Sequence, residues 1–285
     1  MGACTPAVCI SLHSLLSLSP LVQSTISMSD LVISKDQLGG GAQGMVFKGT
    51  WRGIQVAVKK CLQPDPRDVR ILLTLGSHSN VIRLYGVVVE DISCLIVTEL
   101  VRGGSLFDFL YKQKKVPSDD QRSYWMKDIA TGVEFLHRQG IAHRDLKSGN
   151  VLLGDRMTAK LCDFGTARSL DHTTAQSTVT GTYRWMAPEI VDDPNARINK
   201  KCDVYSYSMV LYELVTLKLP FHDAPTDQKA MVDAVLGKRP SLPESDSECA
   251  PFLRRLITAC WDADPKARPS FEKINIALDT KTFPL

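Results

Sequence analysis

Long apolar runs are missing from this sequence, and its excess of positive charge is small. No segment reaches the roughly 20 consecutive apolar residues that a membrane-spanning helix needs. The formal net charge is only +3, which gives no general reason to expect binding to nucleic acid or to an anionic membrane. The sequence therefore predicts no membrane span and no nucleic-acid partner.

C-x-x-C pairs are also missing, so a zinc knuckle is not expected. The cysteines instead stand singly along the chain, at Cys4, Cys9, Cys61, Cys94, Cys162, Cys202, Cys249 and Cys260. Such a spread is typical of reduced, buried thiols in an intracellular protein rather than of a disulfide framework. We therefore expect a cytoplasmic location.

Charged side chains are absent from the first 29 residues, which are rich in Ser and Leu. A signal peptide is the weaker interpretation, because a basic start and a clear small-residue cleavage site are missing. The opening MGACTP departs from the N-myristoylation pattern, which has Ser or Thr where Pro6 stands. We expect residues 1–29 to be a disordered leader.

What is present is an ordinary globular composition, with 44% hydrophobic and 23% charged residues in 285. Residues 30–100 contain runs such as QVAVKK and SCLIVTEL, which predict β-strands separated by turns. The glycines of VRGGSL (101–106) end this pattern, and the chain beyond them is mainly helical. We expect a small β lobe, a hinge and a larger helical lobe, and domain boundaries commonly host small-molecule sites.

Two helices are predicted from local patterns. Ser118 followed by Gln121 forms a capping-box signature, and an apolar stripe at helical spacing follows and runs to Leu136. The segment DVYSYSMVLYELVT (203–216) is apolar nearly all round, which predicts a helix buried inside a lobe.

The segment LGGGAQGMVF carries the pattern G-x-G-x-x-G-x-V at Gly39, Gly41, Gly44 and Val46. Alone this pattern is weak, because glycine clusters also make ordinary turns. A dinucleotide site would open a helix here, whereas this sequence continues with a β-run and VAVK. That order matches a hairpin whose backbone covers ATP phosphates, with Lys59 as the candidate cation for the α- and β-phosphates.

Three further motifs follow in order along the chain. HRDLKSGN (143–150) fits the catalytic-loop pattern H-R-D-L-x-x-x-N, and DFG (163–165) and APE (187–189) come after it. With the glycine motif and VAVK, five motifs agree in order and spacing. From residue 30 to about residue 278, the chain resembles the eukaryotic protein kinases.

Finer details narrow the resemblance. Lys147 after HRDL resembles the Ser/Thr-specific pattern, which disfavours a tyrosine kinase. GTYRWMAPE and WRGIQVAVKK are similar to the tyrosine-kinase-like group, and the segment after Lys59 resembles mixed-lineage, MAP-kinase-kinase-kinase-like members. The resemblance implies a bilobal α+β kinase fold, with an antiparallel β-sheet lobe at 30–100 and a mainly helical lobe at 101–281.

By resemblance, the chain transfers the γ-phosphate of ATP to Ser or Thr hydroxyls of proteins, with Mg²⁺. Asp145 would orient the acceptor hydroxyl and take its proton, and Lys147 would steady the γ-phosphate. Asn150 and Asp163 would hold Mg²⁺, which prefers oxygen ligands. Thr182 would bridge Asp145 and Lys147.

The resemblance also implies an ATP-binding set. Adenine would lie between Val46 and Ala57 above and Leu152 below, and the backbone of Glu99 and Val101 would bind its edge. Thr98 falls at the gatekeeper position, and Ser105 is a weaker candidate for the ribose. The full set is Leu38, Gly39, Gly40, Gly41, Gly44, Val46, Ala57, Lys59, Thr98, Glu99, Val101, Ser105 and Leu152.

Other matching residues are expected to be structural. We expect His143 to support Phe164, Glu189 and Arg268 to form a buried ion pair, and Asp203 to hold the catalytic-loop backbone. Cys162 is expected to be a buried thiol, and the alternative is a cysteine that ligands can reach.

Arg144 beside Asp145 is typical of kinases that need an anion on the activation segment. We predict that Thr173, Thr174, Ser177 or Thr178 is phosphorylated for full activity, by an upstream kinase or by autophosphorylation. The alternative is a polar surface loop whose hydroxyls are only solvated.

The sequence departs from the family at the residue that pairs with the strand lysine. No Glu occurs between Lys59 and Glu90, and the best match is Asp68. Asp is one methylene shorter than Glu, so we expect the site to be active but slow. The alternative function is an ATP-binding pseudokinase that acts as a scaffold or allosteric partner. The expected partners are protein substrates, by family analogy a MAP-kinase-kinase.

Overall fold

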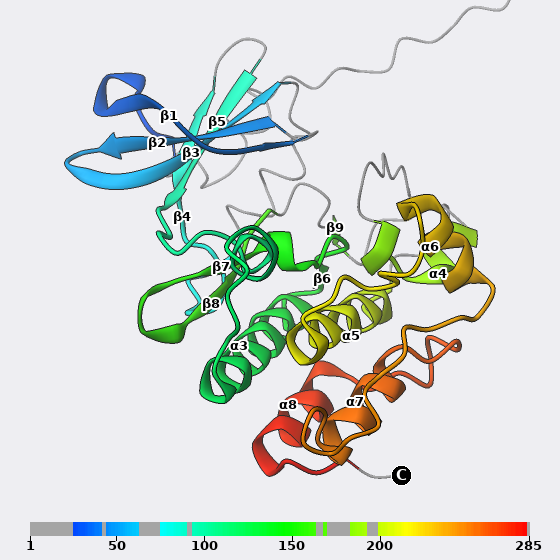
Figure 1. The fold of residues 1–285 in the computed structure, drawn as a ribbon. Coiled ribbons are helices and arrows are strands. Elements are labelled where there is room, and N and C mark those ends of the chain that lie inside the picture. Colours follow the sequence, from blue (N-terminus) through cyan, green and yellow to red (C-terminus); the bar gives the residue numbers. More distant parts are fainter. Residues whose placement is uncertain are drawn as a thin grey trace, which may run out of the picture. The chain divides into compact units, whose positions relative to one another are not determined.

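The structure is a computed structural model, and its contacts divide the chain into two units (Figure 1). The first unit comprises residues 1–76 and 83–100, and the second comprises residues 77–82 and 101–285. The residues that the structure describes are 25–41, 44–62, 75–89, 93–163, 168–169, 183–192 and 199–283.

The first unit is built on an antiparallel five-stranded sheet in the order β1-β2-β3-β5-β4. β5 is a nearly continuous apolar run whose consecutive residues Cys94 to Val97 are all buried, which suits a strand inside the sheet that is covered on both faces. The elements are the 3₁₀ helix η2 (Met28–Asp30) and the strands β1 (Leu31–Gly41), β2 (Gly44–Trp51), β3 (Ile54–Leu62), β4 (Leu84–Val89) and β5 (Ser93–Glu99).

The core of the first unit begins before residue 30. The backbone N–H of Ile26 donates to the carbonyl of Val87 over 2.8 Å, and the Ile26 side chain is buried. It packs with one face of the sheet, in a cluster with Leu31, Val56, Val58, Val88, Leu95 and Val97. The predicted leader is therefore packed on the sheet from residue 25, and residues 1–24 lie outside the described residues.

The second unit is mainly helical in its described part. Its helices are α3 (Asp119–Arg138), α4 (Pro188–Asp192), α5 (Lys201–Thr216), α6 (Asp227–Val235), α7 (Pro251–Cys260) and α8 (Phe271–Thr280). Short strand pairs and turns lie among them: β6 (Ile141–Ala142) with β9 (Arg168–Ser169), β7 (Val151–Leu153) with β8 (Ala159–Leu161), and the single-turn helices η3 (Asp108–Lys112), η4 (Ser148–Asn150), η5 (Asp155–Met157) and η6 (Tyr183–Trp185).

Both predicted helices are confirmed. α3 begins with the predicted capping box, in which Ser118 accepts from the Gln121 N–H and Gln121 accepts from the Ser118 N–H. α5 is buried along almost its whole length, as its apolar sequence predicts. The two helices pack against each other, and α8 packs against α3 (Figure 1).

The short segment 77–82 completes the second unit. Asn80 and Ile82 exchange backbone hydrogen bonds with Leu161 of β8, at 2.9 and 2.8 Å. A Cβ added to Gly132 of α3 would lie 2.7 Å from the Asn80 carbonyl oxygen, so α3 approaches this segment at its backbone. This close approach explains why a glycine stands in the middle of a helix.

These observations confirm the α+β fold class, with a small antiparallel sheet and a mainly helical remainder. The predicted boundaries at residues 30–100 and 101–281 stay predictions. No helix in the described ranges has the length and apolarity to cross a bilayer.

Candidate active site

The loop from His143 to Asn150, here called the catalytic loop, is held by one buried carboxylate. Asp203 in the first turn of α5 is fully buried. It accepts 2.8 Å hydrogen bonds from the backbone N–H groups of His143 and Arg144 and from Nε2 of His137. The predicted role of Asp203 in holding this backbone is confirmed.

Burial would raise the pKa of Asp203, because the apolar interior disfavours the charged form. The hydrogen bond from His137, the nearby histidines and the Arg144 N–H outweigh this effect, and the pKa lies below its ordinary value. Asp203 is therefore an ionised anchor at neutral pH. Arg144 has a φ of 66°, a conformation that costs energy and that this anchor helps to hold.

His143 links two parts of the site through its two ring nitrogens. Nδ1 lies 3.3 Å from the Asp145 backbone N–H, and Nε2 lies 3.1 Å from the Cys162 carbonyl oxygen. An N–H faces Nδ1 and a carbonyl faces Nε2, so the ring joins the backbone of the catalytic loop to the backbone at Cys162. His143 is fully buried, which supports the prediction of a structural role.

The Asp145 carboxylate is buried and held on one side. Its Oδ2 accepts from Lys147 Nζ and from Asn150 Nδ2, both at 2.8 Å. Asn150 Nδ2 also donates to the Asp145 backbone carbonyl at 2.7 Å. Among the described residues, no hydrogen bond is made to Oδ1. The carboxylate is therefore fixed in orientation, with one oxygen left to accept a proton.

Asn150 and Asp163, the predicted metal ligands, are joined through the backbone. The Cys162 N–H donates to the Asn150 carbonyl at 3.0 Å, which brings Asp163 beside the catalytic loop. The Asn150 amide nitrogen is occupied by Asp145, so the side-chain oxygen is left for another partner. Asp163 has a φ of 62°, and such strained backbone is concentrated at functional sites.

A second buried carboxylate, Glu213 of α5, was not predicted from the sequence. It accepts 2.7 Å hydrogen bonds from Ser148 Oγ of the catalytic loop and from Trp185 Nε1 of η6. Burial raises the pKa of Glu213 to about 7, although these hydrogen bonds and the nearby Tyr111 oppose the shift. A single Glu inside the apolar run LYELVT is the signal that could have indicated a buried, hydrogen-bonded role.

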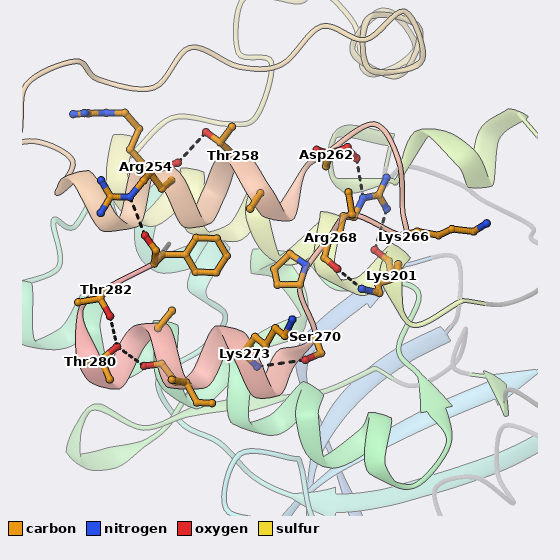
Figure 2. A pocket seen from close by; sticks show the side chains of 17 residues that line it. Lys201, Arg254, Thr258, Asp262, Lys266, Arg268, Ser270, Lys273, Thr280 and Thr282 are labelled. Atoms are coloured by element: carbon orange, nitrogen blue, oxygen red, sulfur yellow. Dashed lines mark hydrogen bonds between the residues drawn. The ribbon is translucent and has the colours of Figure 1, made fainter. Parts of the chain in front are cut away.

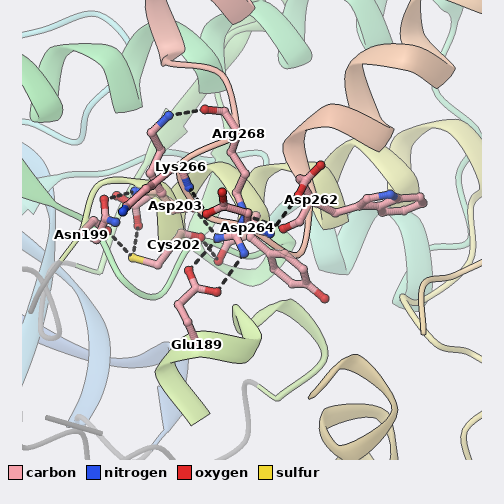
Figure 3. Close-up of polar contacts among 12 residues, drawn as sticks. Glu189, Asn199, Cys202, Asp203, Asp262, Asp264, Lys266 and Arg268 are labelled. Atoms are coloured by element: carbon pink, nitrogen blue, oxygen red, sulfur yellow. Dashed lines mark hydrogen bonds and ion pairs between the residues drawn. The ribbon is translucent and has the colours of Figure 1, made fainter. Parts of the chain in front are cut away.

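The predicted ion pair of Glu189 and Arg268 is confirmed (Figure 3). Arg268 donates to both carboxylate oxygens of Glu189, at 2.6 and 2.8 Å. It also donates to the backbone carbonyls of Asp262 and Lys201. The guanidinium is fully buried, and this set of acceptors satisfies it.

Within the first unit, the sheet gathers four of the predicted nucleotide-binding residues on one face. Val46 is opposite Lys59 across β2 and β3, and Ala57 is opposite Thr98 across β3 and β5. Directly opposite residues share a face, and alternate residues of one strand do too. Val56 and Val58, which alternate with Ala57 and Lys59 along β3, belong to the core on the other face.

The glycines of the β1–β2 hairpin differ in whether the structure requires a glycine at their position. Gly44 has a φ of 125°, and an added Cβ would overlap the carbonyl oxygen of Lys60. The fold itself therefore demands glycine at this position. A Cβ on Gly39 would meet no atom within 4 Å, so packing does not explain that glycine. Gly41 is paired with Gly44, and Leu38 is half exposed.

The remaining predicted residues lie at the ends of elements. In the first unit, the Glu99 N–H donates to the Arg83 carbonyl, and the Glu99 carbonyl accepts from Thr98 Oγ1 at 3.3 Å. In the second unit, the backbone of Ser105 forms an isolated antiparallel β-bridge with Leu152, and its Oγ donates to Asp108 over 2.7 Å. Ser105 therefore serves η3, and Val101 precedes it in the turn that leads there.

A family model described as protein tyrosine and serine/threonine kinase matches residues 32–278. The chain belongs to this protein kinase family. The kinase motifs of the catalytic loop, Asp163 and the Glu189–Arg268 pair all lie inside the match, which confirms the resemblance stated from the sequence.

The kinase domain is similar to several curated relatives. A probable serine/threonine-protein kinase of Dictyostelium discoideum is 37% identical over 278 residues, covering 90% of this chain and 20% of that protein. Serine/threonine-protein kinase STY17 of Arabidopsis thaliana is 34% identical, with coverage of 87% and 44%. Mitogen-activated protein kinase kinase kinase 13-A of Xenopus laevis is 36% identical, with coverage of 85% and 24%. The chain thus spans less than half the length of these kinases.

Some predicted residues of the kinase domain lie outside the described part of the chain. They are the lysine partner Asp68, Phe164, Thr182 and the phosphorylation candidates Thr173, Thr174, Ser177 and Thr178.

Proposed function

We propose that this kinase domain transfers the γ-phosphate of ATP to Ser or Thr hydroxyls of proteins, with Mg²⁺. The observation that carries this proposal is the hydrogen bonding of the Asp145 carboxylate. One carboxylate oxygen is fixed by Lys147 and Asn150, and no hydrogen bond from the described residues reaches the other. A base held in one orientation by two hydrogen-bond donors is suited to accept a proton from a positioned hydroxyl.

The roles of the catalytic-loop residues follow from their atoms. Asp145 Oδ1 accepts the proton of the acceptor hydroxyl as the hydroxyl oxygen attacks the γ-phosphorus, and the bond from that phosphorus to the β–γ bridging oxygen breaks to release ADP. Lys147 Nζ lies 2.8 Å from Oδ2 and supplies positive charge next to the reacting group. Asp203 and His143 act through the backbone, since they hold the N–H groups that fix the loop. Phosphoryl transfer depends mainly on such positioning and charge neutralisation.

Asn150 and Asp163 fit the proposed Mg²⁺ by the chemistry of their donors. Both offer side-chain oxygens, which Mg²⁺ prefers, and the backbone bond between Cys162 and Asn150 holds the two positions near each other. The Asn150 amide nitrogen is turned to Asp145, which leaves the oxygen for a cation. When bound, Mg²⁺ supplies charge neutralisation for the phosphates.

The nucleotide-binding part of the proposal is supported by the first unit. Val46, Ala57, Lys59 and Thr98 share one face of the sheet and combine an apolar surface with a cation. Packing does not require glycine at Gly39, and a phosphate approached by the backbone there is a reason for glycine. The remaining members of the set predicted above are proposed on the family resemblance.

The specificity for Ser and Thr is supported by Lys147 and by relatives whose names include serine/threonine-protein kinase. The similarity to a mitogen-activated protein kinase kinase kinase supports a MAP-kinase-kinase as the substrate class, in a signalling cascade. The proposal has three further parts. The activation segment is phosphorylated by an upstream kinase or by autophosphorylation. The kinase is cytoplasmic, and Asp68 is the partner of Lys59.

The test compares the wild-type protein with Asp145→Asn in ATP, Mg²⁺ and a generic acceptor protein. Asp145→Asn removes the base and keeps the shape, so we expect transfer to fall by roughly 100- to 10,000-fold. Stabilisation of the protein by Mg·ATP, measured by thermal denaturation, should be retained. The matched control is Asp279→Asn, an exposed aspartate of α8 that pairs with Lys127.

Each outcome of this comparison has a defined meaning. Phosphoserine or phosphothreonine that is lost only in Asp145→Asn supports the proposal. Nucleotide binding by the wild-type protein without transfer would overturn catalysis and favour the pseudokinase alternative. Phosphotyrosine as the main product would overturn the Ser/Thr specificity.

A further inference from the structure

A groove in the second unit, formed by α7, α8 and the loop between them, is here called the α7–α8 groove (Figure 2). Its volume is about 930 Å³, at the upper end of the range for small-molecule sites. Six cationic side chains line it against one carboxylate, that of Asp262. The cations are Lys201, Arg254, Arg255, Lys266, Arg268 and Lys273.

Internal contacts account for some of this charge. Arg268 is neutralised by Glu189, and Arg254 contacts Asp246 at 3.2 Å along with three backbone carbonyls. Arg255 donates Nε to the Phe283 carbonyl, which carries no formal charge. Four cations then remain against the single carboxylate of Asp262.

Two of these cations have no hydrogen-bonding or ionic partner for their side chain in the described ranges. The ammonium groups of Lys266 and Lys273 make no hydrogen bond or ion pair with the described residues, and both side chains are exposed. Lys201, between them in the groove, donates to the Arg268 carbonyl (Figure 2). Burial and then the proximity of Lys273 and Arg268 lower the pKa of Lys201, although Cys260 and Asp264 oppose this shift.

The groove is also partly apolar. Ile276 of α8 lines it and is 56% exposed. Ala259, Pro269 and Ala277 add small apolar surfaces beside it. An occupant must therefore offer both negative charge and an apolar group. A single phosphate would supply only the first and would fill little of the volume.

We propose that the α7–α8 groove binds an acidic segment of a partner protein. The acidic side chains of the segment would pair with Lys266 and Lys273, and an apolar side chain would cover Ile276. Charge complementarity of this kind accelerates association and selects the partner. This site is separate from the catalytic loop, and its occupation does not require that the kinase domain be active.

The test measures binding of fluorescein-labelled ten-residue peptides by fluorescence anisotropy. Each peptide carries five Asp or Glu residues and one Leu, whose position varies across the set, and matched peptides carry Asn and Gln instead. We expect at least one acidic peptide to bind, and its amide counterpart to bind at least tenfold more weakly. Binding should weaken as salt rises, because screening acts on exposed charges.

The decisive variant is Lys266→Glu combined with Lys273→Glu, which we expect to weaken binding by about tenfold or more. The matched control is Lys114→Glu combined with Lys218→Glu, two exposed lysines outside the groove. Ile276→Ser should weaken binding too, because the apolar contact is lost. Circular dichroism and phosphotransfer to a generic acceptor should be unchanged in every variant.

Each of the following outcomes would overturn the proposal. One is that no acidic peptide exceeds its amide counterpart, or that both double variants lose binding equally. Another is that 10 mM inorganic phosphate displaces the peptide at constant ionic strength, which would make the groove a simple anion site. The third is that vesicles containing phosphatidylserine, and not the peptides, lose binding in the groove variant, which would assign this surface to a membrane.

Discussion

The catalytic loop and the α7–α8 groove use charge in opposite ways. Asp145 of the loop and Asp203 of α5, which holds the loop, each accept hydrogen bonds from several donors, and both are buried. In the groove, the side chains of Lys266 and Lys273 are exposed, and their ammonium groups make no hydrogen bond or ion pair with the described residues. The carboxylates that hold the loop backbone are paired with donors of this chain. The lysines that we propose bind an acidic segment of another protein are exposed to solvent.

One helix turn contributes to both regions. Lys201 and Asp203 lie two residues apart in the first turn of α5. Lys201 lines the groove and Asp203 binds the catalytic-loop backbone. Three substitutions test this contrast, from the largest expected effect to the smallest.

Asp203→Ala should have the largest effect. It would leave the His143 and Arg144 N–H groups and the His137 ring without their buried acceptor. We expect the free energy of unfolding to fall by about 3 to 5 kcal/mol, as when one partner of a buried charged network is removed. Urea unfolding measures this change.

The matched control for Asp203 is Asp279→Ala, which removes a surface ion pair with Lys127. We expect this control to cost less than about 1 kcal/mol. Equal losses in the two variants would show that Asp203 is not an anchor and would remove the contrast between loop and groove.

Glu213→Gln should have an intermediate effect that depends on pH. The folded pKa of Glu213 is about 7, against 4.5 for the ordinary group. Between those values the folded protein holds a proton that the unfolded chain releases, so wild-type stability falls as pH rises. The slope from this group is at most about 1.4 kcal/mol per pH unit.

Glutamine does not titrate, so the variant should lose this component of the pH dependence. Its stability relative to the wild-type protein should therefore improve as pH rises from 5 to 7. Urea unfolding at pH 5, 6 and 7 gives the comparison. Parallel pH profiles would show that Glu213 keeps an ordinary pKa in the folded state.

Lys266→Gln combined with Lys273→Gln should have the smallest effect on stability. Surface substitutions without a structural partner usually change the free energy of unfolding by less than about 0.5 kcal/mol. Removing Lys273 also relieves its repulsion with Lys201, so the direction should be toward stabilisation. Thermal denaturation at low and high salt measures this, and a loss above 1 kcal/mol would contradict the view that these lysines face solvent.

Local sequence signals predicted the parts of the structure that depend on neighbouring residues. The capping box at Ser118 and the buried helix at 203–216 follow from patterns within one turn or one face. The roles of Asp203 and of the Glu189–Arg268 pair came from the family resemblance, because their partners lie far along the chain.

Other features were set by tertiary contacts that no local pattern carries. Glu213 binds Ser148, 65 positions away, and Ile26 packs into a sheet whose strands follow it in the sequence. Gly44 belongs to a phosphate-binding pattern, yet the backbone of β3 is what requires it. The cations of the groove come from α5, α7, α8 and a loop, so only the folded chain brings them together.

Residues 77–82 belong to the second unit, and this limits which fragments of the protein can fold alone. This segment satisfies the backbone of β8 and meets α3 at Gly132, although the residues on both sides of it belong to the other unit. A fragment starting at residue 101 would leave Leu161 with exposed backbone groups and would bare one side of α3. Expressing the helical portion alone should therefore give an aggregating product, and adding the missing peptide in trans should restore solubility.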